Sequence, residues 1–465
     1  MLFNSLEFII FWIAVVCVYY LIPNNTWRKV FLLAASYYFY ACWNVAFLAI
    51  LLFETALSYG LGLSLGRDDG NKRKSKLCCG IVLLLLPLLC FKYLNFILAS
   101  AGDIIHATGL SIAVPQFKIL LPVGISFYTF MAVGYVVDCY KHKIEAEKNI
   151  LDYSLFIGFF PQIASGPIGR ASLMLPQFKE RHPLLYENIA AGAKMMLWGF
   201  FMKLVVGDRA GIYVDTVFGN YAQHNGVSLM LATFLYTIQI YCDFAGYSLI
   251  AIGTAKTMGY DLMTNFNRPY FSQTIGEFWR RWHISLSTWF RDYVYFPLGG
   301  SRCSHLKTYR NLLITFLVSG LWHGAAYNFI LWGGYHAVIQ IVERAAHRKA
   351  ATGSFGRFVN IVITFILAAY GWMLFYAPDL NTAVEITKGY FHLGMPYIHQ
   401  TTIFFFFVGF AILFLKDLKD EFWPNKQLLL SSRYIVVRYL TFAALAVLIV
   451  SIGVLDGGQF IYFKF

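Results

Sequence analysis

The chain has 465 residues, of which 58% are apolar and only 13% are charged. A soluble domain has about 45–50% apolar and about 25% charged residues, so this composition argues against a soluble enzyme. Disorder is excluded as well, because 44 Phe, 31 Tyr and 11 Trp give a large surface that has to be buried. Separate long apolar runs predict an all-α, polytopic membrane protein with roughly ten or more transmembrane helices.

The formal net charge of +13 does not indicate nucleic-acid binding, because the basic residues stand in short clusters between apolar runs. Three of these clusters, at 27–29, 67–76 and 141–148, fall at every second gap between the expected spans. The positive-inside rule places them in the cytoplasm and the N-terminus outside. The eight cysteines show no CxxC spacing, so we predict neither a zinc site nor a disulfide framework.

The apolar runs give the expected spans in chain order. No basic residue precedes Arg28, so the first run lacks the charged start of a signal peptide and should remain as a span. The spans that we expect are residues 8–22, 31–44, 45–65, 80–100, 119–137, 229–253, 312–342, 359–378, 401–415 and 434–455. The chain shows no internal repeat, which predicts a single membrane domain over residues 1–465 and argues against a transporter built from two similar halves.

Residues 158–178 contain three prolines and three glycines among aromatic residues. Such a stretch cannot form a straight helix, and irregular backbone at membrane depth persists only when it is buried in protein or lines a cavity. Two interpretations stay open, a loop that turns at the membrane interface and a re-entrant segment that lines a substrate path.

A helix is expected to start after the capping-box pattern of Thr274 and Glu277. Helical spacing places apolar and polar side chains on opposite faces, which predicts one amphipathic helix at the membrane interface with its tryptophans in the aromatic belt. The apolar face has Trp279, Trp282, Leu286, Trp289, Phe290 and Tyr293, and the polar face has Arg280, His283, Ser287 and Arg291. Structure alone could account for the pattern, but His283 beside arginines also suits an anionic, phosphate-bearing donor.

Two histidines are the only ionisable side chains between Leu312 and Val342. A titratable group at membrane depth is a functional candidate, and a neutral imidazole can accept a proton and return it to a leaving group. His323 stands between Trp322 and Gly324. A hydrogen bond to a neighbouring helix explains His323 equally well and is the favoured explanation for His336. On a continuous helix the two rings lie roughly 220° apart, which disfavours a shared metal ion unless the Gly333-Gly334 pair breaks the helix.

A third polar group, Asp243, occurs inside an apolar span in the sequence QIYCDFAGYS. It could orient a histidine, bind an acceptor, or pair with a basic residue for structure alone. We place the structural role slightly ahead. Lys92 and Lys203, near the ends of their apolar runs, are expected to extend toward the membrane surface.

Several long motifs in order resemble membrane-bound O-acyltransferases, in particular the bacterial branch that contains the membrane subunit of alginate O-acetylation. They cover nearly the whole chain and are LLPVGISFYTFMAVGYVVDCY (120–140), FFPQIASGPIGR (159–170), QIYCDFAGYS (239–248), the stretch 265–300 with WRRWHISLS, GLWHGAAYNFILWGGYHA (320–337) and the C-terminal FIYFKF. The region from about Arg344 to Asn425 has none of these motifs, and there we expect substrate or partner preference to differ.

The resemblance implies a bundle of helices around a funnel or tunnel in the bacterial cytoplasmic membrane. It identifies His323 with the family's invariant histidine and His283 with the second polar position of the site. It further implies acyl transfer from a cytoplasmic thioester, such as acetyl-CoA, to a hydroxyl outside the cell, with no tightly bound cofactor. The implied acceptors are a polysaccharide or a serine of an extracytoplasmic SGNH-type partner protein.

The residues supply chemistry for this reaction. His323 is placed to take the proton of the attacking hydroxyl, and His283 or nearby amide groups could stabilise the oxyanion. Arg280, Arg281 and Arg291 are candidates for the donor's phosphates, and Trp282, Trp322 and Asp243 for further substrate contacts. Two other classes fit a multi-span bundle with buried titratable groups, a glycan or lipid flippase with a histidine proton relay and a non-catalytic scaffold.

Overall fold

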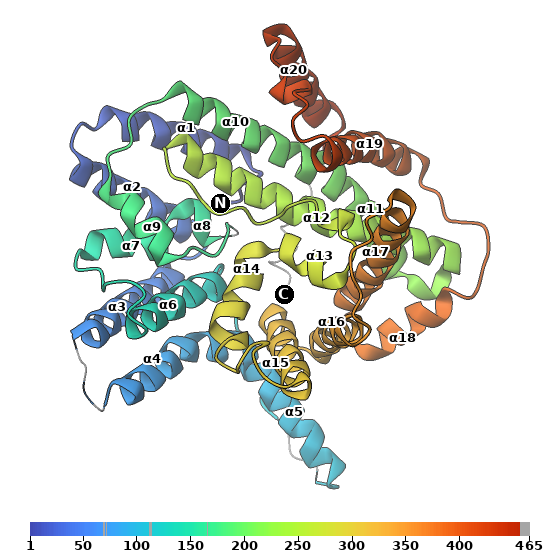
Figure 1. Ribbon diagram of the computed structural model, residues 1–465, viewed down its shortest axis with the longest axis horizontal. Coiled ribbons are helices and arrows are strands. Elements are labelled where there is room, and N and C mark those ends of the chain that lie inside the picture. The colour runs from blue at the N-terminus through green and yellow to red at the C-terminus, as the bar shows by residue number, and fades with distance from the viewer. Residues whose placement is uncertain (68–69, 71, 111–113, 165, 456–465) are drawn as a thin grey trace. The chain divides into compact units, whose positions relative to one another are not determined.

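The computed structural model describes residues 1–67, 70, 72–110, 114–164 and 166–455. Within these ranges the chain is all-helical and has no strand, as the composition predicts (Figure 1). Seven helical stretches are long and apolar enough to cross a membrane: Val45–Arg67, Arg73–Ala107, Tyr186–Gly219, Gly226–Thr257, Ser354–Tyr376, Gln400–Phe422 and Ile435–Ile452. Shorter apolar helices accompany them at Leu6–Leu21, Ile125–Tyr140 and Ile150–Ile163. The C-terminal FIYFKF lies outside the described residues.

The described chain forms two compact units, and the prediction of a single domain over residues 1–465 stays a prediction. The first unit comprises residues 7–186 and 258–262. Its elements are α1 (Leu6–Leu21), α2 (Asn25–Ala41), α3 (Val45–Arg67), α4 (Arg73–Leu88), η1 (Leu89–Tyr93), α5 (Leu94–Ala107), α6 (Ile125–Tyr140), α7 (Ile150–Gly158), α8 (Phe160–Ile163) and α9 (Ala171–Lys179). As expected from its prolines and glycines, the 158–178 stretch is no straight helix, because α7 ends at Gly158 and α8 and α9 are short.

Part of the basic cluster at residues 27–29 is buried in this first unit. Lys29 Nζ lies 2.5 Å from Asp152 Oδ1, and the Arg28 guanidinium donates to the carbonyl oxygens of Ile22 and His182 at 2.6 and 2.8 Å. These two cations therefore stabilise the fold in addition to any effect on orientation in the membrane.

Among the described residues, the second unit comprises 2–6, 187–257 and 263–455 and contains every predicted site residue. Its elements are α10 (Tyr186–Phe200), η2 (Phe201–Gly207), α11 (Asp208–Gly219), η3 (Tyr221–Gln223), α12 (Gly226–Thr257), η4 (Pro269–Phe271), α13 (Ile275–Arg281), α14 (Ile284–Phe290), η5 (Arg291–Tyr295), α15 (His305–His323), α16 (Tyr327–Ala345), α17 (Ser354–Tyr376), α18 (Leu380–Gly389), α19 (Gln400–Phe422), η6 (Leu429–Ser431) and α20 (Ile435–Ile452).

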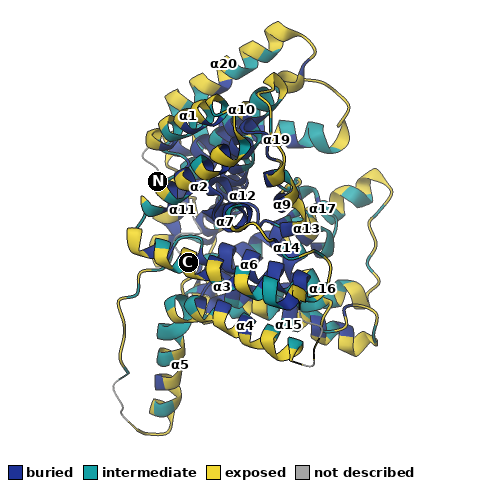
Figure 2. Cartoon of the chain, turned by 90° about the vertical axis from the view of Figure 1, so that its left-hand side faces the viewer, coloured by how far each residue is buried: buried dark blue, intermediate teal, exposed yellow. Residues whose placement is uncertain are grey.

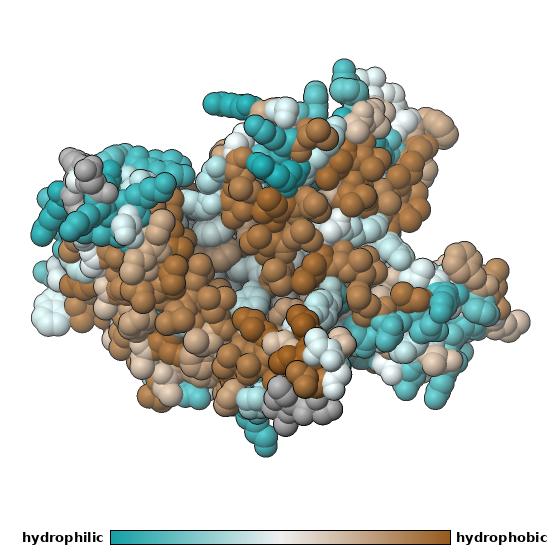
Figure 3. Space-filling model, turned by 90° about the horizontal axis from the view of Figure 1, so that it is seen from below, coloured by the Kyte–Doolittle hydropathy of each residue, from teal (hydrophilic) through white to brown (hydrophobic). Residues whose placement is uncertain are grey.

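Helix α12 is the buried core of the second unit (Figure 2). The backbones of α10 and α12 touch where Gly199 meets Gly246, because a Cβ added at Gly199 would lie 2.6 Å from the Gly246 carbonyl oxygen. Such small-residue contacts let membrane helices pack closely without a hydrophobic driving force between them. In contrast, exposed apolar side chains cover α20 and α19, and one face of the molecule shows broad hydrophobic areas (Figure 3).

The prediction of a single amphipathic helix after Thr274 is wrong. Helix α13 ends at Arg281, and His283 adopts a left-handed conformation (φ 42°, ψ 56°) before α14 begins at Ile284. The predicted helix start is confirmed, because the Thr274 side chain accepts from the Glu277 backbone N–H at 3.0 Å. The tryptophans of this segment are buried within the protein, with Trp282 only 1% exposed, and do not form an interfacial belt.

The 312–342 stretch is also two helices. Helix α15 ends at His323 and α16 begins at Tyr327, so the break falls at residues 324–326 and not at the Gly333-Gly334 pair. Gly324 is extended, and a Cβ there would lie 2.0 Å from the ring of Phe329. Only glycine lets this ring approach the chain so closely. Because the backbone is extended at Gly324, His323 is the last residue of α15.

Candidate functional site

His323 lies in an aromatic cage at the end of α15. The side chain is buried, with 4% of the residue exposed. Its ring centroid lies 4.9 Å from that of Trp322, 5.0 Å from that of Trp332 and 5.3 Å from that of Phe375, all in edge-on arrangements. These aromatic side chains exclude water from the imidazole, which is the setting that a thioester needs to avoid hydrolysis.

His283 lies near His323, because the rings of both histidines pack against that of Trp322. The ring centroids of His283 and Trp322 lie 6.1 Å apart, and Phe244 packs edge-on against His283 at 4.6 Å. Of the predicted site residues, His283, Trp322 and His323 thus form one cluster. Burial lowers the pKa of His283 to about 3, because a charged imidazolium loses its hydration there.

The polar partners of His283 come from residues 265 and 285. Asn265 Oδ1 lies 3.0 Å from His283 Nδ1, and the backbone N–H of Ile284 donates to the carbonyl oxygen of Asn265 at 2.9 Å. These contacts hold the left-handed turn in place. Nothing local in the sequence singles out Asn265, because its partners Ser248 and His283 lie 17 and 18 positions away in the chain.

A cationic cleft of about 860 Å³ lies between α13, α14, α15 and α16, and its lining includes Ile284, the residue after His283, but none of the three cluster residues. Among the described residues that line it, the basic side chains are Arg280, Arg291, Arg344, Arg348 and Lys349, and the acidic side chain is Glu343. Ser319, one helical turn before His323, also lines the cleft. The structure therefore places Arg280 and Arg291 in one cleft and adds three cations from residues 344–349.

Arg281 lies elsewhere. Its guanidinium donates to both carboxylate oxygens of Glu421, at 2.9 and 3.1 Å, and pairs with Glu277 at 2.7 Å. Arg268 and Arg357 bind the same Glu421 carboxylate, at 2.9 and 3.5 Å. Trp282, beside Arg281 in sequence, packs against Trp372 with ring centroids 4.6 Å apart. Neither side chain lines the cationic cleft.

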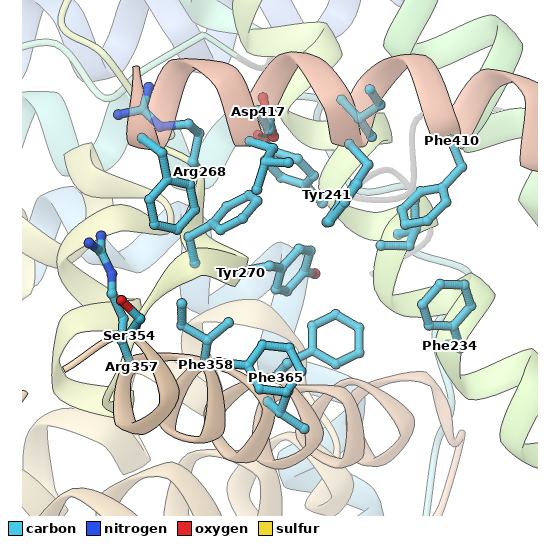
Figure 4. A pocket seen from close by; sticks show the side chains of 18 of the residues that line it. Phe234, Tyr241, Arg268, Tyr270, Ser354, Arg357, Phe358, Phe365, Phe410 and Asp417 are labelled. Carbon is cyan, nitrogen blue, oxygen red and sulfur yellow. Dashed lines mark hydrogen bonds between the residues drawn. The ribbon is translucent and has the colours of Figure 1, made fainter. Parts of the chain in front are cut away.

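The Arg268 and Arg357 side chains line a second cavity of about 660 Å³, between α12, α17 and α19. They lie at one end of it with Ser354, while Phe234 and Phe410 lie at the other end (Figure 4). The remaining lining is mostly aromatic and aliphatic.

Asp243 on α12 pairs with Lys203 of η2, which also lies 2.7 Å from Asp208 Oδ1. Only 1% of the Lys203 side chain is exposed, so the expectation that this lysine extends toward the membrane surface is wrong. The two carboxylates attract the ammonium group into the core, and Asp243 thereby takes the structural pairing that we placed first among its alternatives.

His336 contacts the same aromatic cage through Trp332, whose ring centroid also lies 5.0 Å from that of His323. It is fully buried, and its ring lies 5.1 Å from those of both Trp279 and Trp332. Within the described ranges, neither of its ring nitrogens has a hydrogen-bond partner, and no group of three or more His, Cys, Asp or Glu residues could hold a metal ion.

Comparison with known proteins agrees with this arrangement. Residues 141–382 match the model of the MBOAT, membrane-bound O-acyltransferase family. The chain is 39% identical to the probable alginate O-acetylase AlgI of Pseudomonas aeruginosa, over 85% of this chain and 75% of that protein. It is 33% identical to the peptidoglycan O-acetyltransferase of Helicobacter pylori, over 84% of this chain and 79% of that protein.

A more distant relative is the teichoic acid D-alanyltransferase of Bacillus subtilis, 29% identical over 56% of this chain and 70% of that protein. The family match covers both histidines of the cluster and the whole lining of the cationic cleft. The chain is a multi-pass membrane protein and an acyltransferase, and it belongs to the membrane-bound O-acyltransferase family.

Proposed function

We propose that the protein is an O-acetyltransferase of the bacterial cytoplasmic membrane, with its N-terminus outside. It moves an acetyl group from a cytoplasmic thioester, acetyl-CoA, to a hydroxyl outside the cell, on a polysaccharide or on a serine of an SGNH-type partner protein. Two relatives are named as a probable alginate O-acetylase and a peptidoglycan O-acetyltransferase, which supports an O-acetyltransferase activity for this protein. No tightly bound cofactor is needed for this chemistry.

The observation that carries the proposal is the position of His323 at the C-terminal end of α15, one helical turn after Ser319, which lines the cationic cleft. The aromatic side chains around the ring keep water away from it, so the imidazole can take a proton from a bound hydroxyl instead of from water.

The reaction follows from this placement. The acceptor oxygen attacks the thioester carbonyl carbon while the Nδ1 or Nε2 of His323 takes the hydroxyl proton, a contribution of about 10²–10⁴-fold. The tetrahedral oxyanion requires a hydrogen-bond donor, which is worth about 3–4 kcal/mol. Collapse breaks the carbon–sulfur bond, and the departing thiolate takes the proton from the imidazolium.

The cationic cleft suits the phosphates of the donor. We expect Arg280→Gln and Arg291→Gln each to raise the KM for acetyl-CoA about three- to tenfold with little change in kcat, because an exposed charge-assisted contact to phosphate is worth about 1 kcal/mol. Steady-state kinetics in detergent measures this. Arg433→Gln, an exposed arginine outside the cleft, is the matched control, and an equal rise in its KM would contradict the assignment.

A vesicle experiment tests the proposed direction of transfer. Radiolabelled acetyl-CoA is supplied only to the cytoplasmic face of oriented vesicles that contain the protein and an acceptor polysaccharide or partner. We expect label on the acceptor at the opposite face. Label that appears only when the donor is supplied from outside would refute the proposal.

A further inference from the structure

The hydrogen bonds around Asn265 determine which ring nitrogen of His283 carries a proton. Asn265 Oδ1 lies 3.0 Å from His283 Nδ1, 2.9 Å from Ser285 Oγ and 3.2 Å from the Ser285 backbone nitrogen. The amide nitrogen of Asn265 points the other way and donates to Ser248 Oγ at 3.1 Å. All four residues are buried, so these contacts are not exchanged with bulk water.

The backbone N–H of Ser285 can only donate, and this fixes the orientation of the Asn265 amide. If the amide were turned over, its NH₂ group would face the Ser285 N–H, and two donors would oppose each other. The atom that faces His283 Nδ1 is therefore the oxygen. An amide oxygen only accepts, so Nδ1 has to carry the proton of the ring.

We propose that Asn265 is a positioning residue, which holds His283 as the Nδ1–H tautomer so that Nε2 acts toward the substrate as a hydrogen-bond acceptor. Burial keeps the His283 ring neutral. A neutral imidazole with its proton on Nδ1 has a lone pair on Nε2, which can accept a hydrogen bond. His283 consequently cannot donate from Nε2 to an oxyanion. The stabilisation of the oxyanion, which the sequence suggested for His283, therefore has to come from other hydrogen-bond donors in the cluster.

Within the proposed acyl transfer, on which this inference rests, the two histidines have different tasks. His323 ends α15 and takes the proton of the attacking hydroxyl, whereas His283 accepts a hydrogen bond from a different O–H or N–H group of the bound substrates. Thioesters of coenzyme A carry amide N–H groups, and sugars carry hydroxyls next to the reacting one. Both present the donor that an Nε2 acceptor requires.

The tautomer can be observed directly in the full-length protein labelled with ¹⁵N-histidine in detergent. The His283 resonances are those that disappear in His283→Gln. We expect a proton-bearing Nδ1 and an unprotonated Nε2 in the wild type. An Nε2 that carries the proton would overturn the proposal whatever the enzyme does, so this reading is distinguishable from a failure of the proposed function.

Kinetic variants give the second test. We expect Asn265→Ala to allow the other tautomer and to lower kcat at least about 10²-fold, on the scale of a lost acid–base or orienting contact. Asn265→Asp, whose carboxylate still accepts from Nδ1 and from the Ser285 N–H, should recover most of kcat.

Ser285→Ala is the matched control. It removes the hydroxyl, which lies 2.9 Å from Asn265 Oδ1 and 3.5 Å from His283 Nδ1, but keeps the backbone N–H that orients Asn265, so its tautomer should match the wild type. If Asn265→Ala does not fold, the wild-type spectrum and the pair Asn265→Asp and Ser285→Ala still decide the question. Wild-type kcat and tautomer in a folded Asn265→Ala, or a loss of the tautomer in Ser285→Ala, would contradict the proposal.

Discussion

Replacement of His323 by alanine is expected to abolish acetyl transfer, with a loss of at least about 10³-fold in single-turnover rate, while the protein stays folded and inserted. The hydroxyl is a poor nucleophile until a base takes its proton, and the change removes the base and the cation that later protonates the leaving thiolate. The measurement is the acetyl content of the acceptor in cells and the single-turnover rate of purified protein.

Ser319→Ala is the control for this change, because Ser319 lies one turn earlier on α15, between His323 and the cationic cleft residues of the same helix. Its rate should stay within a few-fold of the wild type. Immunoblots of membranes and thermal unfolding in detergent show whether His323→Ala is inserted and stable. Normal acetyl content in cells that carry a stably inserted His323→Ala variant would remove the histidine from the chemistry.

The largest loss of stability is expected at Lys203. In Lys203→Met the ammonium group between Asp208 and Asp243 is lost, and two buried carboxylates remain without their shared cation. Removal of one partner from a buried ion cluster costs about 3–5 kcal/mol. We expect a clearly lower unfolding temperature in detergent and reduced amounts in the membrane.

A triple variant separates charge from packing at this cluster. Lys203→Met combined with Asp208→Asn and Asp243→Asn removes the charges of these three side chains, and the triple variant should recover much of the stability that the single variant loses. Lys388→Met, at an exposed lysine, should unfold like the wild type. If the triple variant were as unstable as the single one, the ion pairing would not be the cause.

The fold class was predictable because its signals are local, and the same holds for the choice of the two histidines as candidates. Apolar runs of about 20 residues and isolated histidines at membrane depth are visible in a single sequence, and His323 and His283 do lie in one cluster around Trp322. The helix break at His283 was not predictable, since a regular 3.6-residue pattern continues across it. The break is explained only by backbone hydrogen bonds on either side of it, in which Asn267 donates to the Arg281 carbonyl oxygen and Ile284 donates to that of Asn265.

Neighbouring arginines illustrate a second limit. Arg280 and Arg281 are equally basic, but successive side chains on a helix point about 100° apart. One therefore lines the cationic cleft, while the other meets Glu421 on α19. The charge cluster at 344–349 was visible in the sequence, but nothing local indicated that α16 carries it to α13 and α14.

The Glu421 carboxylate has a consequence for exchanging segments between relatives. It gathers guanidinium groups from three parts of the chain, Arg268 before η4, Arg281 on α13 and Arg357 on α17. Residues 344–425, which have none of the motifs named from the sequence, thus supply both Glu421 and Arg357 to a junction whose other members, Arg268 and Arg281, belong to the 265–300 motif. A chimaera that grafts this stretch from another enzyme to change its acceptor has to bring a carboxylate to position 421, or Arg268 and Arg281 lose this shared counter-ion and Arg281 keeps its pair with Glu277.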